Sequence, residues 1–266
     1  MTSRVLSAER ISQAAAAVGP VLGIETGGPV ISLGVVNGGR IKASFARELP
    51  SHCAGLPIAI DEVLGAAGFR LPDLVGVAIG IGPGSFTGLR VGLSYAKGLA
   101  RGLGIVIVGV PSLDAIVLSE PLTPRPGATV CPVLDARRGE VYGALYRFSG
   151  DALQKVVDEF AVSAAELAEM LDGEVIFSGD AARQEVCRLA AIRGVNAIVS
   201  GAGELYLRGS AVAGIGAARI AEHEADEAAT LEPLYVRPSG AVRASILGER
   251  NYGTPGRGID PAPRGS

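Results

Sequence analysis

Residues 21–45 have the sequence VLGIETGGPVISLGVVNGGRIKASF, which predicts three short strands in succession. The run 21–25 is short and apolar, and the apolar residues of 30–36 and 41–45 alternate as they do on one face of a strand. Between the last two runs, Asn37-Gly38-Gly39 favours a hairpin turn, because Asn and Gly adopt positive φ at little cost. The stretch therefore predicts a three-stranded antiparallel meander.

The rest of the first half alternates helices with apolar strands. The predicted elements are a helix at 54–67, a strand at 75–81, a helix at 87–103, a strand at 105–110 and a helix at 112–119. Both strands are continuous apolar runs, which are typical of strands covered on both faces. We therefore expect them to join the meander through right-handed helical crossovers.

The second half repeats this order. Its predicted strands are 129–134, 140–148, 153–157, 175–177 and 197–199, and its predicted helices are 164–171, 181–192 and 210–221. A repeat of about 110 residues is too long for a solenoid. We therefore predict an α/β protein of two similar tandem domains, each a mixed sheet with helices on both faces.

The predicted organisation has four parts. We expect a loosely attached N-terminal extension at 1–20, a first domain at 21–119, a second domain at 120–237 and a mobile tail at 238–266, which is rich in Gly, Pro and Arg. The last predicted helix of the second domain is a candidate for packing back on the first.

Composition excludes several classes of protein. Apolar residues make up 48% and charged residues 19% of the 266 residues, so the chain is not disordered. The net charge of −3 disfavours a direct nucleic-acid binder, although Arg90, Arg137, Arg138 and Arg237 remain candidates for contacts within a complex. Three widely spaced cysteines fit a reducing compartment, and no apolar run approaches the roughly 18–20 residues of a membrane helix. We therefore expect a cytoplasmic location.

A glycine-rich segment, GIGPGSFTGLRVG at 80–92, lies between a predicted buried strand and a helix. Backbone amides at the start of that helix are suited to holding an anion. Alternatively, the glycines let two backbone segments approach closely. The segment is not a Walker loop, because the G-K-[ST] ending is absent.

The helix that follows has one apolar face. Leu89, Leu93 and Ala96 are three or four residues apart, with Gly88 and Gly92 beside them, and such a face suits close packing against another helix. The spacing leaves open whether that helix belongs to this chain or to a partner.

The glycine-rich segment resembles the signature of the TsaB family, the bacterial accessory subunits of the tRNA threonylcarbamoyladenosine machinery. The resemblance covers about residues 21–237. Further matching stretches are AKGLA at 96–100, DEVL at 61–64, VIVGVPSL at 106–113, VLDARRGEVY at 133–142 and EPLYVR at 232–237.

The resemblance implies two tandem RNase H-like domains, the duplicated fold of the sugar-kinase/Hsp70/actin group. It also implies a non-catalytic subunit that supports a TsaD-type transferase in forming N6-threonylcarbamoyladenosine at position 37 of tRNA. A TsaE-type ATPase would join the assembly, and this chain would contact tRNA only as part of the complex. No intrinsic cofactor is expected, since ATP and Mg²⁺ are used by the assembled complex. A homodimer is a further candidate assembly.

We expect the predicted helices at 54–67 and 87–103 to present the partner-binding face. The residues predicted for this interface are Gly84, Phe86, Gly88, Leu89, Gly92, Leu93 and Ala96.

The alternative is an ATP-dependent phosphotransferase or ATPase of the same superfold, so whether the chain is an enzyme stays open. Its first phosphate turn would be Glu25-Thr26-Gly27-Gly28, where the resemblance leads one to expect aspartate instead of Glu25. The second turn would be 135–139, where two arginines occupy the approach that glycines leave open for phosphate. We therefore predict at most a vestigial nucleotide or anion site at the first turn. The two histidines, His52 and His223, lack metal-ligand spacing, so no metal site is predicted.

Overall fold

The computed structural model describes residues 5–48, 52–119, 122–123, 125–180, 182–200 and 208–236. The predicted tail at 238–266 therefore lies outside the described residues. Among the helices of this part, none is long and apolar enough to cross a membrane.

The first sheet has five strands in the order β4-β3-β2-β5-β6. Their bounds are β2 Val21–Glu25, β3 Ile31–Asn37, β4 Arg40–Arg47, β5 Gly76–Gly82 and β6 Val106–Pro111. The strands β2, β3 and β4 pair antiparallel, as the meander predicts. The strands β5 and β6 are parallel to β2, as the crossovers predict.

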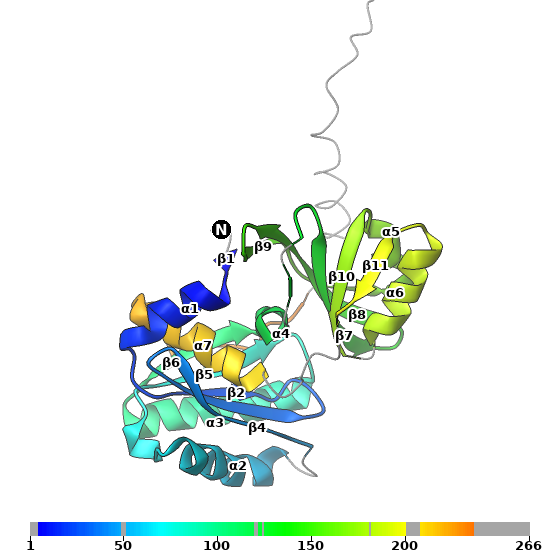
Figure 1. The fold of residues 1–266 in the computed structure, drawn as a ribbon. Helices are drawn as coiled ribbons and strands as arrows, with labels where there is room; N and C mark the ends of the chain where they lie inside the picture. The colour runs from blue at the N-terminus through cyan, green and yellow to red at the C-terminus, as the bar shows by residue number, and fades with distance from the viewer. Residues whose placement is uncertain are drawn as a thin grey trace, which may run out of the picture.

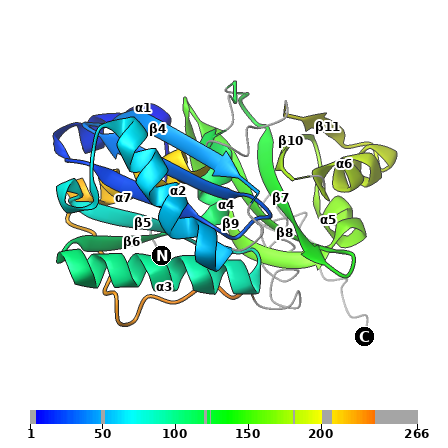
Figure 2. The same ribbon diagram turned by 90° about the horizontal axis from the view of Figure 1, so that it is seen from below.

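Helices cover both faces of this sheet (Figures 1 and 2). On one face lie α2 (His52–Ala67) and α3 (Phe86–Leu103), whose apolar side chains form one core with the sheet. On the other face lies α7 (Arg208–Ala221), the last helix of the chain that the structure describes. Because α7 follows the second sheet in sequence, the chain returns to the first sheet after it has formed the second.

The second sheet repeats the strand order of the first, β9-β8-β7-β10-β11, with β1 added beside β9. Its strands are β1 Val5–Leu6, β7 Thr129–Arg137, β8 Glu140–Ser149, β9 Ala152–Ser163, β10 Glu174–Gly179 and β11 Asn196–Val199. Helices α5 (Ala164–Met170) and α6 (Ala182–Ile192) cover one face. The prediction of two tandem RNase H-like domains, each a mixed sheet with helices on both faces, is confirmed.

Helix α4 (Ser112–Ser119) lies between the two halves. Leu113, Ile116 and Val117 pack on the second sheet, on the face opposite α5 and α6. Ala115 packs with α7 instead. A single short helix thus contributes to the cores of both halves.

The N-terminal segment differs from the loosely attached extension that the sequence predicts. Val5 and Leu6 pair antiparallel with Leu153 and Gln154 of β9. Helix α1 (Ala8–Ala14) and the 3₁₀ helix Ala15–Ala17 pack on α7. Composition gave no sign of this attachment, because two short elements with mixed polarity have no strong period of their own. Residues 5–17 bridge the second sheet and the last helix.

Candidate functional site

The turn after β2 is tied to the start of α3. The Gly27 N–H donates to Glu25 Oε1 at 2.7 Å, and the Ser85 N–H donates to the Gly27 carbonyl at 2.7 Å. The Thr26 hydroxyl donates to the Gly88 carbonyl at 2.9 Å. The candidate phosphate turn is therefore held by this chain's own groups.

The glycine-rich segment owes its composition to this contact. A Cβ placed on Gly84 would lie 2.6 Å from the Gly27 carbonyl oxygen, and a Cβ on Gly88 or Gly92 would overlap Thr26. Of the two interpretations of the segment, the geometry supports the close approach of two backbones. The Ser85 side chain then caps α3 by accepting from the Gly88 N–H at 3.3 Å.

The Glu25 carboxylate is buried over the neighbouring strand, where a Cβ on Gly80 would overlap it. Its Oε2 atom has no hydrogen-bond partner in the part of the chain that the structure describes. The predicted residues Glu25, Thr26, Gly27 and Gly28 are thus gathered at one strand end, yet the Gly27 amide is already used within the turn.

The second candidate phosphate turn, between β7 and β8, has an unusual backbone. Arg137 has a φ of 70° and Arg138 a φ of 57°, which is the left-handed region that disfavours side chains. Arg137 is exposed and pairs with Asp135 at 3.3 Å.

No group of three or more His, Cys, Asp or Glu side chains among the described residues is placed to hold a metal ion.

The structure corrects most of the predicted interface residues. Leu93 and Ala96 are buried in the core that α3 forms with the first sheet of this same chain, and Leu89 is buried beside Gly27 and Gly82. Gly88 and Gly92 are buried against Thr26. The helix that covers a sheet turns its most apolar stripe inward, so this stripe is not available to a partner.

Two further members of the predicted set lie at the entry to α3. Gly84 is half-buried against Gly27, whereas the Phe86 side chain is 56% exposed. Phe86 is therefore the one large apolar side chain of the predicted set that faces outward.

The outer face of α3 and the adjoining part of α2 form a groove of about 590 Å³. We call it the α2/α3 groove. It is lined by Leu56, Phe86, Thr87, Arg90, Val91, Ser94 and Tyr95. Partial burial, together with the nearby Asp61 carboxylate, raises the pKa of Tyr95, so its phenol stays neutral.

Sequence reasoning missed Leu56, Val91 and Tyr95 as residues that line the groove, and Leu56 is at the same time fully buried in the first core. The available signal was the occurrence of Val91 and Tyr95 four residues apart on α3, outside the stripe of leucines and alanines. In the part of the chain that the structure describes, the first sheet covers the inner face of α3.

Comparisons with known proteins agree with the motifs. The sequence model of the family described as "TsaD: tRNA N6-adenosine threonylcarbamoyltransferase" matches residues 49–245. The "tRNA threonylcarbamoyladenosine biosynthesis protein TsaB" of Bacillus subtilis is 28% identical over 221 residues, or 82% of this chain and 93% of the relative. The protein of the same name from Escherichia coli is 32% identical over 164 residues, or 60% of this chain and 70% of the relative.

A solved structure shows the same fold. YeaZ from Pseudomonas aeruginosa superposes with a TM-score of 0.65 at 21% sequence identity, which covers 82% of this chain and 100% of that chain. With the extent of the family match and the relatives above, the chain belongs to the family described by the TsaD model and, within it, to the tRNA threonylcarbamoyladenosine biosynthesis proteins called TsaB.

Proposed function

We propose that this chain is a non-catalytic subunit that binds a TsaD-type transferase through the α2/α3 groove. In this role it supports the formation of N6-threonylcarbamoyladenosine at position 37 of tRNA. The names of its relatives place them in this biosynthesis. The observation that carries the proposal is the exposed apolar groove on the first domain.

The side chains around the α2/α3 groove are those of a protein-binding surface. In the groove lining, Phe86 is 56% exposed, while Val91 and Tyr95 are half-buried. On α2, Ile58 is 63% exposed. Aromatic residues in partly formed pockets supply most of the binding energy at protein interfaces. Contiguous exposed apolar surface is uncommon on chains that act alone. Helices of a partner, packed against α2 and α3, would cover this surface.

The two candidate phosphate turns favour this role over that of an ATP-dependent phosphotransferase. A phosphate at the first turn would have to displace the Gly27–Glu25 hydrogen bond and the Ser85–Gly27 contact. At the second turn, Arg137 and Arg138 stand where small residues would let backbone amides reach an anion. We therefore propose that ATP and Mg²⁺ are used by the assembled complex and not by this chain alone. The complex would also contain a TsaE-type ATPase, would bind the tRNA, and would lie in the cytoplasm.

The test is the affinity of the full-length chain for the TsaD-type transferase of the same organism. Val91→Glu places a charge in the lining of the groove, while Arg101→Glu changes charge at the exposed far end of α3. We expect Val91→Glu to weaken binding about 30-fold or more, the effect of losing one dominant contact. Arg101→Glu should bind as the wild type does.

Two results would contradict the proposal. One is undiminished transferase binding by a folded Val91→Glu protein. The other is Mg²⁺-dependent ATP hydrolysis by the isolated chain that Glu25→Ala abolishes. Self-association that competes with the transferase for the groove would identify a homodimer as a second use of the same face.

A further inference from the structure

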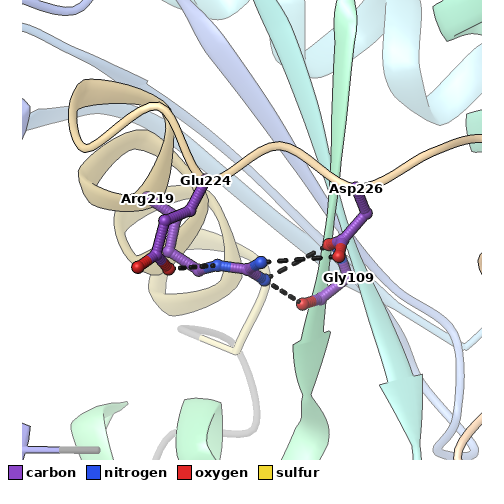
Figure 3. A network of polar contacts seen from close by, with 4 residues as sticks. All are labelled: Gly109, Arg219, Glu224 and Asp226. Carbon is purple, nitrogen blue, oxygen red and sulfur yellow. Dashed lines mark hydrogen bonds and ion pairs between the residues drawn. The ribbon is translucent and has the colours of Figure 1, made fainter.

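The segment that follows α7, residues 222–236, forms a strap around the open edge of the first sheet. Asp226 is its first anchor. The Asp226 N–H donates to the Ile107 carbonyl at 2.9 Å, and its Oδ2 accepts from the Gly109 N–H at 2.8 Å. The Arg219 Nη1 donates to the Gly109 carbonyl at 2.8 Å and also pairs with Asp226 at 3.3 Å (Figure 3). Both backbone groups of Gly109, on edge strand β6, are thereby satisfied.

We call these contacts of Asp226 and Arg219 with Gly109 the clip. From the clip, the strap passes to the opposite face of the sheet. A Cβ on Gly109 would lie 2.7 Å from Leu231 Cδ1, so the strap runs directly over the edge of the sheet. The Leu234 N–H then donates to the Ile81 carbonyl at 2.8 Å. In Figure 2 this orange segment runs beside α3. The strap therefore connects the last helix on one face with the groove-forming helix on the other.

At its end the strap holds an aromatic and cationic triplet. The Arg90 Nη2 and Nε donate to the Tyr235 hydroxyl at 3.0 and 3.2 Å. The Arg90 guanidinium lies 3.7 Å from the centre of the Phe86 ring, and the Phe86 and Tyr235 ring centres are 6.0 Å apart. Phe86 and Arg90 also line the α2/α3 groove, so the triplet forms its rim.

The charge of Arg90 is not neutralised within the part of the chain described here. Its hydrogen-bond acceptor is the neutral Tyr235 hydroxyl, and no described carboxylate lies within ion-pair distance. Arg219, by contrast, has both Glu224 and Asp226. A fixed, unneutralised guanidinium beside an apolar groove complements a carboxylate, which it binds with two parallel hydrogen bonds.

We propose that Arg90, positioned by Tyr235 on the clipped strap, selects an acidic side chain on the protein that occupies the α2/α3 groove. This inference rests on the proposed function and adds the chemistry of the partner: an apolar helical surface with a carboxylate at its edge. The apolar walls of the groove favour such a protein over an RNA phosphate.

The experiment is a calorimetric titration of the full-length chain with the transferase at low and high salt. Arg90→Gln should weaken binding about tenfold at low salt and much less at high salt, because a rim charge acts through long-range attraction that salt screens. Arg101→Gln, on the same helix but outside the groove, is the matched control and should keep the wild-type affinity and salt dependence.

The strap has its own pair of variants. Asp226→Ala removes the clip on the far side of the sheet and should reproduce the loss seen for Arg90→Gln, with no further loss when the two are combined. Glu224→Gln leaves the Asp226–Gly109 clip in place and should bind as the wild type does. Thermal unfolding of each variant shows whether a loss of binding affinity comes from a destabilised fold.

The outcomes separate the two proposals. Wild-type binding that Arg90→Gln leaves unchanged at both salt concentrations would overturn this inference alone. Arg90-dependent binding of isolated tRNA, without an effect on the transferase, would overturn it in favour of a nucleic acid. A wild-type chain that does not bind the transferase would overturn the proposed function, and this inference with it.

Discussion

At the scale of single residues, a buried lysine fastens α4 to the second sheet. Lys155 on β9 is 9% exposed and pairs with Asp114 of α4 at 2.8 Å and with Glu159 at 2.6 Å. The Tyr146 hydroxyl donates to the same Asp114 carboxylate at 2.6 Å. Burial alone lowers the pKa of Lys155, but the two carboxylates outweigh it and raise the pKa, so the ammonium stays charged. One cation thus holds two nearly buried anions.

We expect Lys155→Met to destabilise the protein by about 3–5 kcal/mol, because it leaves two carboxylates buried without a cation. The measurement is the free energy of unfolding in urea. Adding Asp114→Asn should recover part of the loss, since it removes one of the stranded charges and keeps an acceptor for Tyr146. If the two substitutions change the free energy of unfolding additively, Lys155 and Asp114 are not coupled in this way.

At the scale of elements, α7 lies directly on the strands beneath it. A Cβ on Gly23 or Gly34 of the sheet would overlap the α7 backbone, and a Cβ on Gly209 of the helix would overlap the backbone at Leu33. The Gly209 N–H also donates to the Ser32 hydroxyl at 2.9 Å. Glycines on both partners therefore bring helix and sheet closer than side chains would allow.

Gly34→Ala should lower the free energy of unfolding by about 1–3 kcal/mol through overpacking at this contact. Gly98 is the matched control, because it lies in α3, where a Cβ would meet nothing within 4 Å. Gly98→Ala should raise stability by about 0.5–1 kcal/mol, since alanine restricts the unfolded chain and favours the helix. Equal effects of the two substitutions would contradict the close contact.

Much of the element order could be predicted from the sequence. The bounds of β2 are those predicted, because its apolar run ends at the turn residues Thr26-Gly27-Gly28, and α4 begins at the predicted Ser112. Strand β9 is longer than the predicted 153–157, since irregular pairing around Leu145 interrupts the two-residue period. The site was harder to predict. Helical spacing identifies the Leu89–Ala96 stripe but not what covers it, and the structure places this chain's own sheet there.

At the scale of the whole molecule, three connections join the halves within the described residues. They are α4 between the sheets, α7 on the first sheet, and the N-terminal segment across both. Leu6 is 6% exposed and packs into the core of the second sheet, whereas its neighbour Val5 is 44% exposed. Helix α1, directly after them, packs on α7. The first domain, which carries the α2/α3 groove, is thus braced against the second.

Leu6→Asp should release this brace, because it places a charge in an apolar core. Hydrogen exchange in α1 should become faster, while Val5→Asp, on the exposed side of the same strand, should change it little. Unchanged exchange in the Leu6→Asp protein would show that α1 is held by α7 alone.

The most direct test of the central claim is a hydrogen-exchange footprint of the wild-type chain with and without its TsaD-type transferase. Binding at the α2/α3 groove predicts slower exchange in α2, α3 and the strap that ends at Tyr235, and no change at the turn 25–28. Slower exchange at that turn and at the β7–β8 turn, with α2 and α3 unaffected, would contradict the account.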